Sequence, residues 1–414
     1  MRALTRARGG NDRGAMLIQV AISILMLMGF TVFVIDYGVV LVGRGQAQNA
    51  ADAGALAGVL ARAFDDTADP PATGGVAWNA ATQAAAANLV WREPGVAEPS
   101  WDCPAGTSGR CVRVDVYRDG SHGSATLPVF FGHLFGIDSQ RVKATATARV
   151  VYGNATDCIR PWGVADKWTE VRAPTTQFNK WDKVGSAPVM LSPHDDYVAP
   201  SEDGAGTGFR LPDDFGAEIT LKNGNPSNDN DPITPGWFLP LRLPDGQGGY
   251  NTGASDMRDE IAGCIGVTVK IGDYLPLEDG AMIGPTNQGF DLLKAKDPDA
   301  RWVPTPAPGL IADSCAPSAG CGSFSPRVVA LPVFDIDEFQ FHRAGGISPG
   351  ESSPWSQCPM GGKCVRVVNI LGFFADRMEG TDVIGYLYRY PGIITAGSSV
   401  SDDASFLVTV QLIR

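Results

Sequence analysis

The chain has 414 residues, of which 44% are hydrophobic and 19% are charged, a balance that excludes a wholly disordered protein. Its 50 glycines and 30 prolines exceed what helical bundles carry and favour short strands joined by turns. The formal net charge of −12 argues against nucleic-acid binding, because that function needs a basic face to neutralise phosphates. The length is typical of two or three domains.

The N-terminal segment has the pattern of a membrane anchor. Residues 1–14 carry four arginines and one aspartate, a formal charge of +3. The next 21 residues, Ala15–Ile35, carry no charge, and at about 1.5 Å per residue they span about 31 Å, the thickness of a hydrocarbon core. Asp36 closes the run, at an edge where it can reach water. Because the arginines precede the run, we expect a single pass with the N-terminus inside and the bulk of the chain exported.

Three interpretations of this apolar run remain open: an uncleaved signal anchor, a cleaved signal peptide and a buried core helix. A cleaved signal peptide has an apolar stretch of about 7–15 residues, which is shorter than this one. A core helix would not explain the arginines in front of it. The length of the apolar run and the arginines in front of it therefore favour the uncleaved anchor.

Helical character continues beyond the apolar run. No proline interrupts the chain from Ala15 to Arg62, so we expect one continuous helix. Small residues recur every four positions between Ala47 and Ala61, a spacing that lets another element approach closely. Alanine is also a good helix former, which is the plainer explanation. The glycines in this stretch lower helix propensity, and they therefore favour packing, against residues 65–152 or against a partner.

The segment V-I-D-Y-G, followed by Q-N-A-A-D-A-G-A-L-A-G, closely resembles the N-terminal domain of TadG-like Flp pilus-assembly proteins. The positions that carry the resemblance are Arg13, Gly14, Asp36, Gly38, Gln48, Asn49, Ala50, Ala51, Asp52, Ala53, Leu56 and Ala57. The resemblance covers about residues 13–64, and a looser likeness continues through residues 127–150. It implies an envelope protein of the tight-adherence pilus machinery, anchored in the bacterial cytoplasmic (inner) membrane, with no catalytic activity.

No catalytic, cofactor-binding or metal-binding motif is found. The chain lacks H-E-x-x-H, G-x-S-x-G and the P-loop, and it lacks the D-x-S-x-S metal motif that some relatives of the resembled family carry. His194, Asp195 and Asp196 could bind a metal, but a solvated loop between prolines is favoured. Asn225–Pro232 offers oxygen ligands for calcium, yet it lacks the glycine and glutamate that complete an EF-hand, so a polar turn is favoured.

All eight cysteines follow the apolar run, which is typical of an exported protein with disulfides. Six of them form close pairs in sequence: Cys103 with Cys111, Cys315 with Cys321, and Cys358 with Cys364. Cys158 and Cys264 are then left for each other. Zinc is the alternative, but no pair has the C-x-x-C spacing of the usual zinc sites.

The expected exported part divides into two regions with different sequence patterns. An alanine-rich helix is predicted at Val76–Trp91, and strands with period-two alternation at Cys111–Arg118 and Arg141–Tyr152. Beyond residue 158, short apolar runs separated by proline and glycine predict a mostly β domain, with one helix at Gln288–Ala295. The predicted fold is α+β, with four parts: a basic tail at 1–14, the anchor at 15–42, a helix with a small α+β region at 43–152, and a larger, mostly β, disulfide-containing domain at 158–414.

We therefore predict a non-enzymatic structural or assembly protein of a Flp-type pilus system. Its expected partners are the bilayer and other pilus-assembly proteins, bound through the helix at residues 47–61. The alternatives are an anchored adhesin or glycan-binding module, suggested by nine tryptophans, and a hydrolase whose carboxylates meet only in the fold. A deep cleft with close carboxylates would favour the hydrolase, and an exposed row of tryptophans would favour the adhesin.

Overall fold

The computed structural model divides into two compact units. Unit 1 comprises Met1–Val150 with Val410–Arg414, and unit 2 comprises Val151–Thr409. The sequence places the boundary at 152–158, close to this division, but it assigns residues 410–414 to the second part, and the structure joins them to the first. The residues that the structure describes are 12–65, 69–107, 109–167, 181–184, 187–190, 197–200, 206, 208–211, 213–224, 236–305, 308–316, 318, 321, 323–348, 350–395 and 405–413. Residues 1–11 of the basic tail, 194–196 and the calcium candidate at 225–232 lie outside them.

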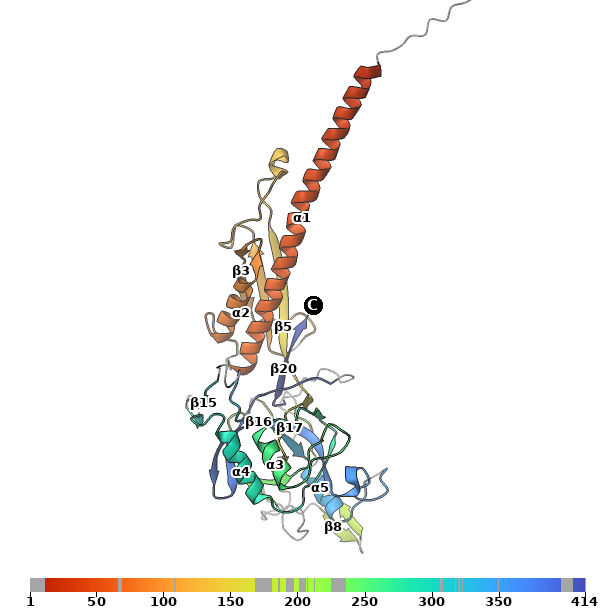
Figure 1. Ribbon diagram of the computed structural model, residues 1–414, viewed down its shortest axis with the longest axis vertical. Helices are drawn as coiled ribbons and strands as arrows, with labels where there is room; N and C mark the ends of the chain where they lie inside the picture. The colour runs from red at the N-terminus through yellow and green to blue at the C-terminus, as the bar shows by residue number, and fades with distance from the viewer. Residues whose placement is uncertain are drawn as a thin grey trace, which may run out of the picture. The chain divides into compact units, whose positions relative to one another are not determined.

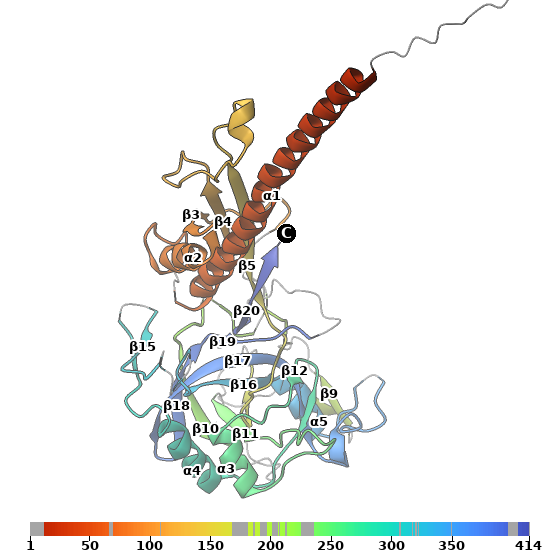
Figure 2. The same ribbon diagram turned by 45° about the horizontal axis from the view of Figure 1, so that its top comes forward.

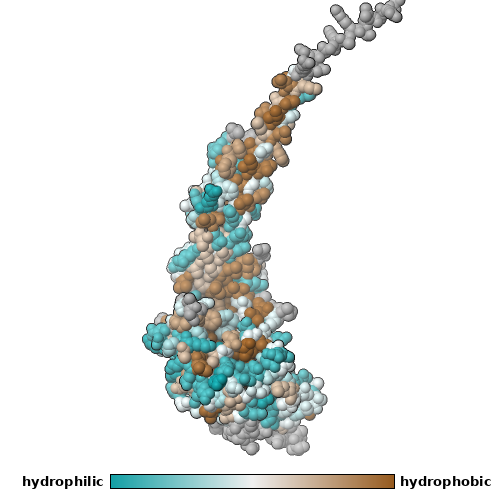
Figure 3. All heavy atoms as spheres, viewed as in Figure 1, coloured by the Kyte–Doolittle hydropathy of each residue, from teal (hydrophilic) through white to brown (hydrophobic). Residues whose placement is uncertain are grey.

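One long helix begins unit 1. Helix α1 (Asp12–Phe64) runs for 53 residues without a break, as the absence of proline predicts (Figure 1). Arg62 stands in its last turn, where a positive charge favours the helix dipole. The side chains from Met16 to Ile35 are mostly exposed and form an apolar surface (Figure 3).

The second half of α1 packs on the rest of unit 1. Helix α2 (Val76–Ala87) lies beside α1, and four neighbouring strands of a five-stranded sheet, in the order β20-β5-β4-β3, complete the unit. The sheet strands are β3 (Val96–Ser100), β4 (Cys111–Arg118), β5 (Val142–Tyr152) and β20 (Leu407–Ile413). In β4, Val112, Val114 and Val116 are buried on one face, which confirms the alternation in the sequence.

The helix predicted at Val76–Trp91 is too long by four residues. It ends at Ala87, because Leu89 and Val90 form β1 (Leu89–Val90) and pair antiparallel with β2 (Glu93–Pro94). A short 3-10 helix, η1 (Gly132–Phe135), lies in the long connection between β4 and β5.

A seven-stranded sheet with the order β13-β17-β16-β7-β11-β10-β18 forms the centre of unit 2. Its strands are β7 (Trp162–Ala165), β10 (Glu218–Asn223), β11 (Trp237–Pro240), β13 (Tyr274–Pro276), β16 (Val328–Phe334), β17 (Cys364–Glu379) and β18 (Asp382–Tyr388). Every residue of β16 is buried, as a continuous apolar run predicts. Strand β18 also pairs antiparallel with β17, so the sheet curls back on itself, and Figure 2 shows β16, β17 and β18 side by side.

Smaller elements surround this sheet. The short strands are β6 (Ala155–Thr156), β8 (Trp181–Val184), β9 (Ala187–Met190), β12 (Val269–Lys270), β14 (Arg301–Val303), β15 (Leu310–Ala312) and β19 (Tyr390–Pro391). The helical elements are α3 (Ala254–Ala262), α4 (Ile283–Lys294), α5 (Ile336–Arg343) and the 3-10 turn η2 (Pro359–Gly361). The α+β fold class is therefore confirmed, although unit 2 holds two helices, α3 and α5, that the sequence patterns did not indicate.

The structure contains four disulfides, and they are the four pairs that the sequence spacing predicts. The Cα atoms lie 5.2 Å apart in Cys103–Cys111, 4.6 Å in Cys158–Cys264, 5.8 Å in Cys315–Cys321 and 5.5 Å in Cys358–Cys364. These separations suit the bridge geometry. No described cysteine is left free.

Candidate functional site

The first half of α1 is long and apolar enough to cross a membrane. It holds an apolar window of which no part is buried inside the structure. A core helix of a water-soluble protein would bury such a surface, because exposed apolar area is costly in water. The unbroken run of uncharged residues ends at Ile35, and the acidic residue Asp36 follows it directly.

Asp36 fastens a distant loop to the helix. Its carboxylate accepts the backbone N–H of Phe130 at 2.8 Å, of Phe131 at 3.1 Å and of Gly132 at 2.5 Å. The side chain is only 6% exposed, so Asp36 does not project into water as expected from the sequence. A carboxylate that accepts several backbone N–H groups satisfies donors that the turn into η1 would otherwise leave without partners.

Leu127 holds the same loop against α1 at a second point, Gly43. Its buried side chain lies against Gly43, where a Cβ would stand only 2.7 Å from Leu127 Cδ1. The backbone N–H of Leu127 donates to the carbonyl of Gln140 at 2.9 Å, which closes the base of the loop. Gly43 is therefore required for the close approach of the two segments.

The small-residue face of α1 packs inside unit 1. Ala47, Ala51 and Ala55 are completely buried, and α2 lies against this face with its own buried alanines. At Gly54, a Cβ would stand 2.9 Å from the carbonyl oxygen of Ala81 and 3.3 Å from a methyl group of Val114. The small residues thus allow the backbones to approach, and they are more than helix-forming filler.

One polar position of the motif, Gln48, links α1 to strand β5. The side-chain amide of Gln48 donates to Asp52 Oδ1 at 2.9 Å and to the carbonyl oxygen of Thr145 at 3.1 Å. Thr145 also donates its hydroxyl to Asp115 on β4. Burial opposes ionisation of Asp115, but the hydrogen bonds from Thr145 and Lys143 outweigh it and hold the pKa of that carboxyl below its usual value.

The end of α1 is held by Arg62, a residue outside the motif. Its buried guanidinium donates to the carbonyl of Cys111 and to Asp69 Oδ1 at 2.5 Å. Arg110 returns a hydrogen bond of 2.7 Å to the Arg62 carbonyl, one of those that a helix end leaves without a partner. Since Cys111 is bridged to Cys103, the helix end is tied to a disulfide-closed segment.

The positions that carry the sequence resemblance thus fall into two groups, those that pack against the rest of unit 1 and those that are exposed. The structure brings Asp36, Gln48, Ala51 and Asp52 against the rest of unit 1, while Asn49 and Leu56 have exposed side chains. Gly14 lies in the first turns of α1, and Ala15 and Ile35 bound the apolar run on it. Most partners of Asp36 and Arg62 could not be found from the sequence, because they are backbone atoms far away in the chain.

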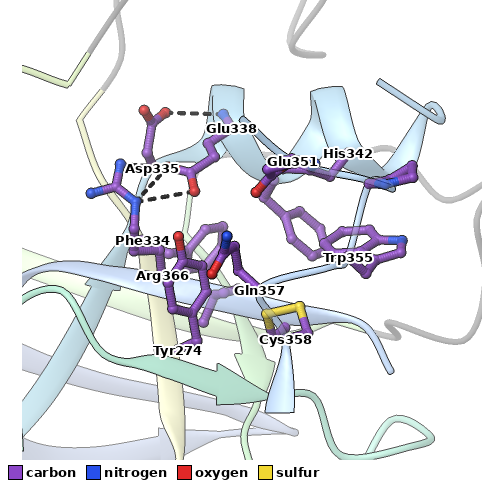
Figure 4. A pocket seen from close by; sticks show the side chains of 14 residues that line it. Tyr274, Phe334, Asp335, Glu338, His342, Glu351, Trp355, Gln357, Cys358 and Arg366 are labelled. Carbon is purple, nitrogen blue, oxygen red and sulfur yellow. Dashed lines mark hydrogen bonds and ion pairs between the residues drawn. A yellow bond between two sulfur atoms is a disulfide. The ribbon is translucent and has the colours of Figure 1, made fainter. Parts of the chain in front are cut away.

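A cavity of about 20 Å³ lies in unit 2, between α5 and strand β17 (Figure 4). Arg366 donates to both carboxylate oxygens of Glu338, at 3.1 and 2.8 Å, and closes one side. His342 Nδ1 lies 3.6 Å from Glu351, and Trp355 packs beside that histidine. The volume is about that of one water molecule and cannot hold a sugar ring.

Two further observations in the described part of unit 2 bear on the alternative functions. None of the tryptophans whose burial is described is exposed, so they form no binding row. Among the described residues, no group of three histidine, cysteine or acidic side chains could hold a metal ion. The described tryptophans thus give the adhesin alternative no support. Acidic side chains do line a larger hollow of unit 2: Asp166 and Glu218 border a volume of about 400 Å³ beside β7 and β10.

Comparison with known proteins identifies the helical segment. Residues 14–63 match the family described as putative Flp pilus-assembly TadE/G-like, which confirms the resemblance found in the sequence. The match covers α1 and nothing of unit 2. No curated protein and no solved structure matches the chain.

Proposed function

We propose that this chain is a membrane-anchored, non-enzymatic assembly protein of a bacterial Flp-type pilus system. The observation that carries the proposal is that the segment similar to pilus-assembly proteins, residues 14–63, forms a single helix with two surfaces. Its first half is apolar and exposed, as a membrane span requires, and its second half organises unit 1.

In this proposal the N-terminus lies in the cytoplasm and both units lie outside the inner membrane. Four disulfides support this orientation, because they persist in oxidising compartments. Alkaline phosphatase, which is active only outside the cytoplasm, can be fused after residue 413 or at the N-terminus. Activity from the first fusion alone is expected, and activity from the N-terminal fusion would contradict the orientation.

The helix surface that unit 1 leaves uncovered is proposed to contact other pilus-assembly proteins. Leu56 and Leu60 stand one turn apart on this surface and are exposed, next to buried Ala55 and Val59. Apolar side chains at i and i+4 can anchor a partner helix.

Complementation of a deletion strain tests this function. The deletion is expected to abolish pili seen by electron microscopy, and the wild-type gene is expected to restore them. A Leu56→Glu/Leu60→Glu variant should reach normal abundance in the membrane yet restore fewer than a tenth of the pili. Leu89→Glu, which changes an exposed leucine on β1, is the matched control and should restore them fully. Normal piliation of the deletion strain would refute the proposed function.

A further inference from the structure

The segment Pro128–Ile137, which we name the aromatic loop, presents apolar side chains on the surface of unit 1. Phe130 is 54% exposed, Phe131 40% and Ile137 49%. Single exposed apolar residues are common in proteins, but three in one short loop form a patch that indicates a binding surface.

The loop is held at a defined level of α1. Leu127 contacts the helix at Gly43, and the amides of Phe130 and Gly132 contact it at Asp36. These two contact points are seven residues apart, about 10 Å along the helix. The loop therefore rises beside α1 toward its apolar half, and η1 lies at the tip (Figure 1).

This level coincides with the expected edge of the hydrocarbon core. If Ala15–Ile35 spans the core, Asp36 lies at its boundary, where the headgroup zone extends roughly 5–7 Å further on each side. A carboxylate at that depth is costly unless it has hydrogen-bond partners, and the three loop amides supply them. Phe33 and Tyr37, whose rings stack at 5.6 Å, place two more exposed aromatic side chains within one turn of Asp36.

We propose that the aromatic loop inserts Phe130, Phe131 and Ile137 into the interfacial zone of the bilayer, as a second membrane contact beside the span. The inference rests on the proposed membrane anchorage. Aromatic and aliphatic side chains are favoured at the boundary between headgroups and acyl chains. His133 of the loop pairs with Asp138, the residue that follows the loop; both side chains are exposed and lie 3.1 Å apart, as suits the headgroup side.

Lipid is favoured over a protein partner because the patch continues an apolar surface at the same level. A single spanning helix leaves rotation about its own axis to be set by other contacts. A loop fastened to the helix by Asp36 supplies such a contact, since a tilted α1 brings the loop closer to the bilayer only when it tilts toward the side that carries the loop.

Depth-dependent fluorescence quenching tests the loop in the full chain. Single cysteines at Phe130→Cys and, separately, Ile137→Cys are labelled with the fluorophore NBD, and the protein is reconstituted in phosphatidylethanolamine–phosphatidylglycerol vesicles. One set of vesicles contains lipids with a spin label near the headgroup, and a second set contains lipids with a spin label deep in the acyl chain, which reaches position 24 in the middle of the span. Leu89→Cys is the matched control in unit 1, because Trp91 contacts α1 at Gln46, about 15 Å below the level of Asp36. Ile24→Cys reports on the span itself.

We expect at least twofold stronger quenching at positions 130 and 137 than at position 89. Quenching at position 24 but not at 130 or 137 would overturn the loop proposal and leave the anchor intact. Absence of quenching at position 24 would instead refute the anchor. Positions that are unquenched in vesicles but shielded from aqueous iodide in native membranes would identify a protein partner, and would also overturn the lipid contact.

Discussion

Gly58 of α1 lies so close to Ala81 of α2 that a Cβ on the glycine would stand 2.8 Å from the alanine methyl carbon. A methyl group of Val112 on β4 would stand 2.9 Å from the same atom. The helix, its neighbour and the sheet therefore meet at a position that only glycine can occupy without a shift.

Gly58→Ala is expected to destabilise unit 1 by about 1–2 kcal/mol. Overpacking of a tight core costs about 1–3 kcal/mol, and the gain in helix propensity offsets up to about 1 kcal/mol of it. Gly45→Ala makes the same change on the same helix where no atom lies within 4 Å, and it should be neutral or stabilising. Urea unfolding of the detergent-solubilised chain compares the two. Equal midpoints would mean that the small face tolerates bulk.

Asp36→Ala should release the aromatic loop while α1 remains helical. Hydrogen bonds to a charged acceptor contribute about 1.5–3 kcal/mol each, so removal of the carboxylate should speed amide exchange at Phe130, Phe131 and Gly132 by at least tenfold. Hydrogen-exchange mass spectrometry measures this directly. Asp138→Ala removes the carboxylate of the residue that follows the loop, and it should leave the exchange of those amides unchanged. Unaltered exchange in Asp36→Ala would contradict the role assigned to Asp36.

The disulfide Cys158–Cys264 should matter more for stability than Cys315–Cys321. The first joins residues 106 apart in sequence and the second joins residues 6 apart. In the loop-entropy estimate, closing about 100 residues contributes about 4.7 kcal/mol, roughly 2 kcal/mol more than a short loop. Paired alanine variants, Cys158→Ala/Cys264→Ala and Cys315→Ala/Cys321→Ala, should therefore differ in denaturant midpoint in that order, and the reverse order would contradict the estimate.

Glu260 of α3 should make the stability of unit 2 depend on pH. Burial raises the pKa of this carboxyl to about 7, with further contributions from Asp256 and Glu278, against the opposing effects of Asn251 and Arg160. The folded protein thus holds a proton that the unfolded chain, with a pKa near 4.5, gives up. The contribution of Glu260 to the free energy of unfolding is therefore greatest below about pH 4.5, and it falls as the pH rises to about 7.

Glu260→Gln removes the charge that burial disfavours. The variant should match the wild type at pH 4.5 and exceed it by about 2–3 kcal/mol at pH 8, in urea unfolding of the full chain. Asp259→Asn, which changes an exposed neighbour on the same helix, should show no such pH-dependent gain. A constant difference between Glu260→Gln and the wild type across this range would exclude titration of Glu260 as the cause.

The parts of the fold that were predictable carry local signals. Strand β4 begins and ends where its alternation does, and α1 runs through the whole proline-free stretch. Helix α3 has only Met257 and Ile261 as large buried apolar residues among charged neighbours, so its periodicity is weak. Helix α5 follows β16 almost at once, and the apolar run of the strand hides the start of the helix.

The contacts around α1 show why the rest could not be predicted. The motif indicated that Asp36 is special, but its partners are backbone amides at Phe130 and beyond, 94 or more residues away, and any residue type supplies such amides. Arg62 likewise binds the carbonyl of Cys111, which has no side-chain signature. Small residues at Ala51 and Gly54 signalled a close neighbour, while the identity of that neighbour came only from the fold.

The placement of Val410–Arg414 in unit 1 means that this unit cannot be completed until the end of the chain has been synthesised. Strand β20 lies next to β5 in the sheet, yet residues 153–406 separate the two strands in the chain. Because the ribosome synthesises the chain from its N-terminus, all of these residues must be made before β20 can cover this edge of β5. Until then β5 presents unpaired amides and carbonyls to its surroundings, a template for pairing with another chain. The nascent protein is thus most dependent on chaperones in the interval just before β20 is made.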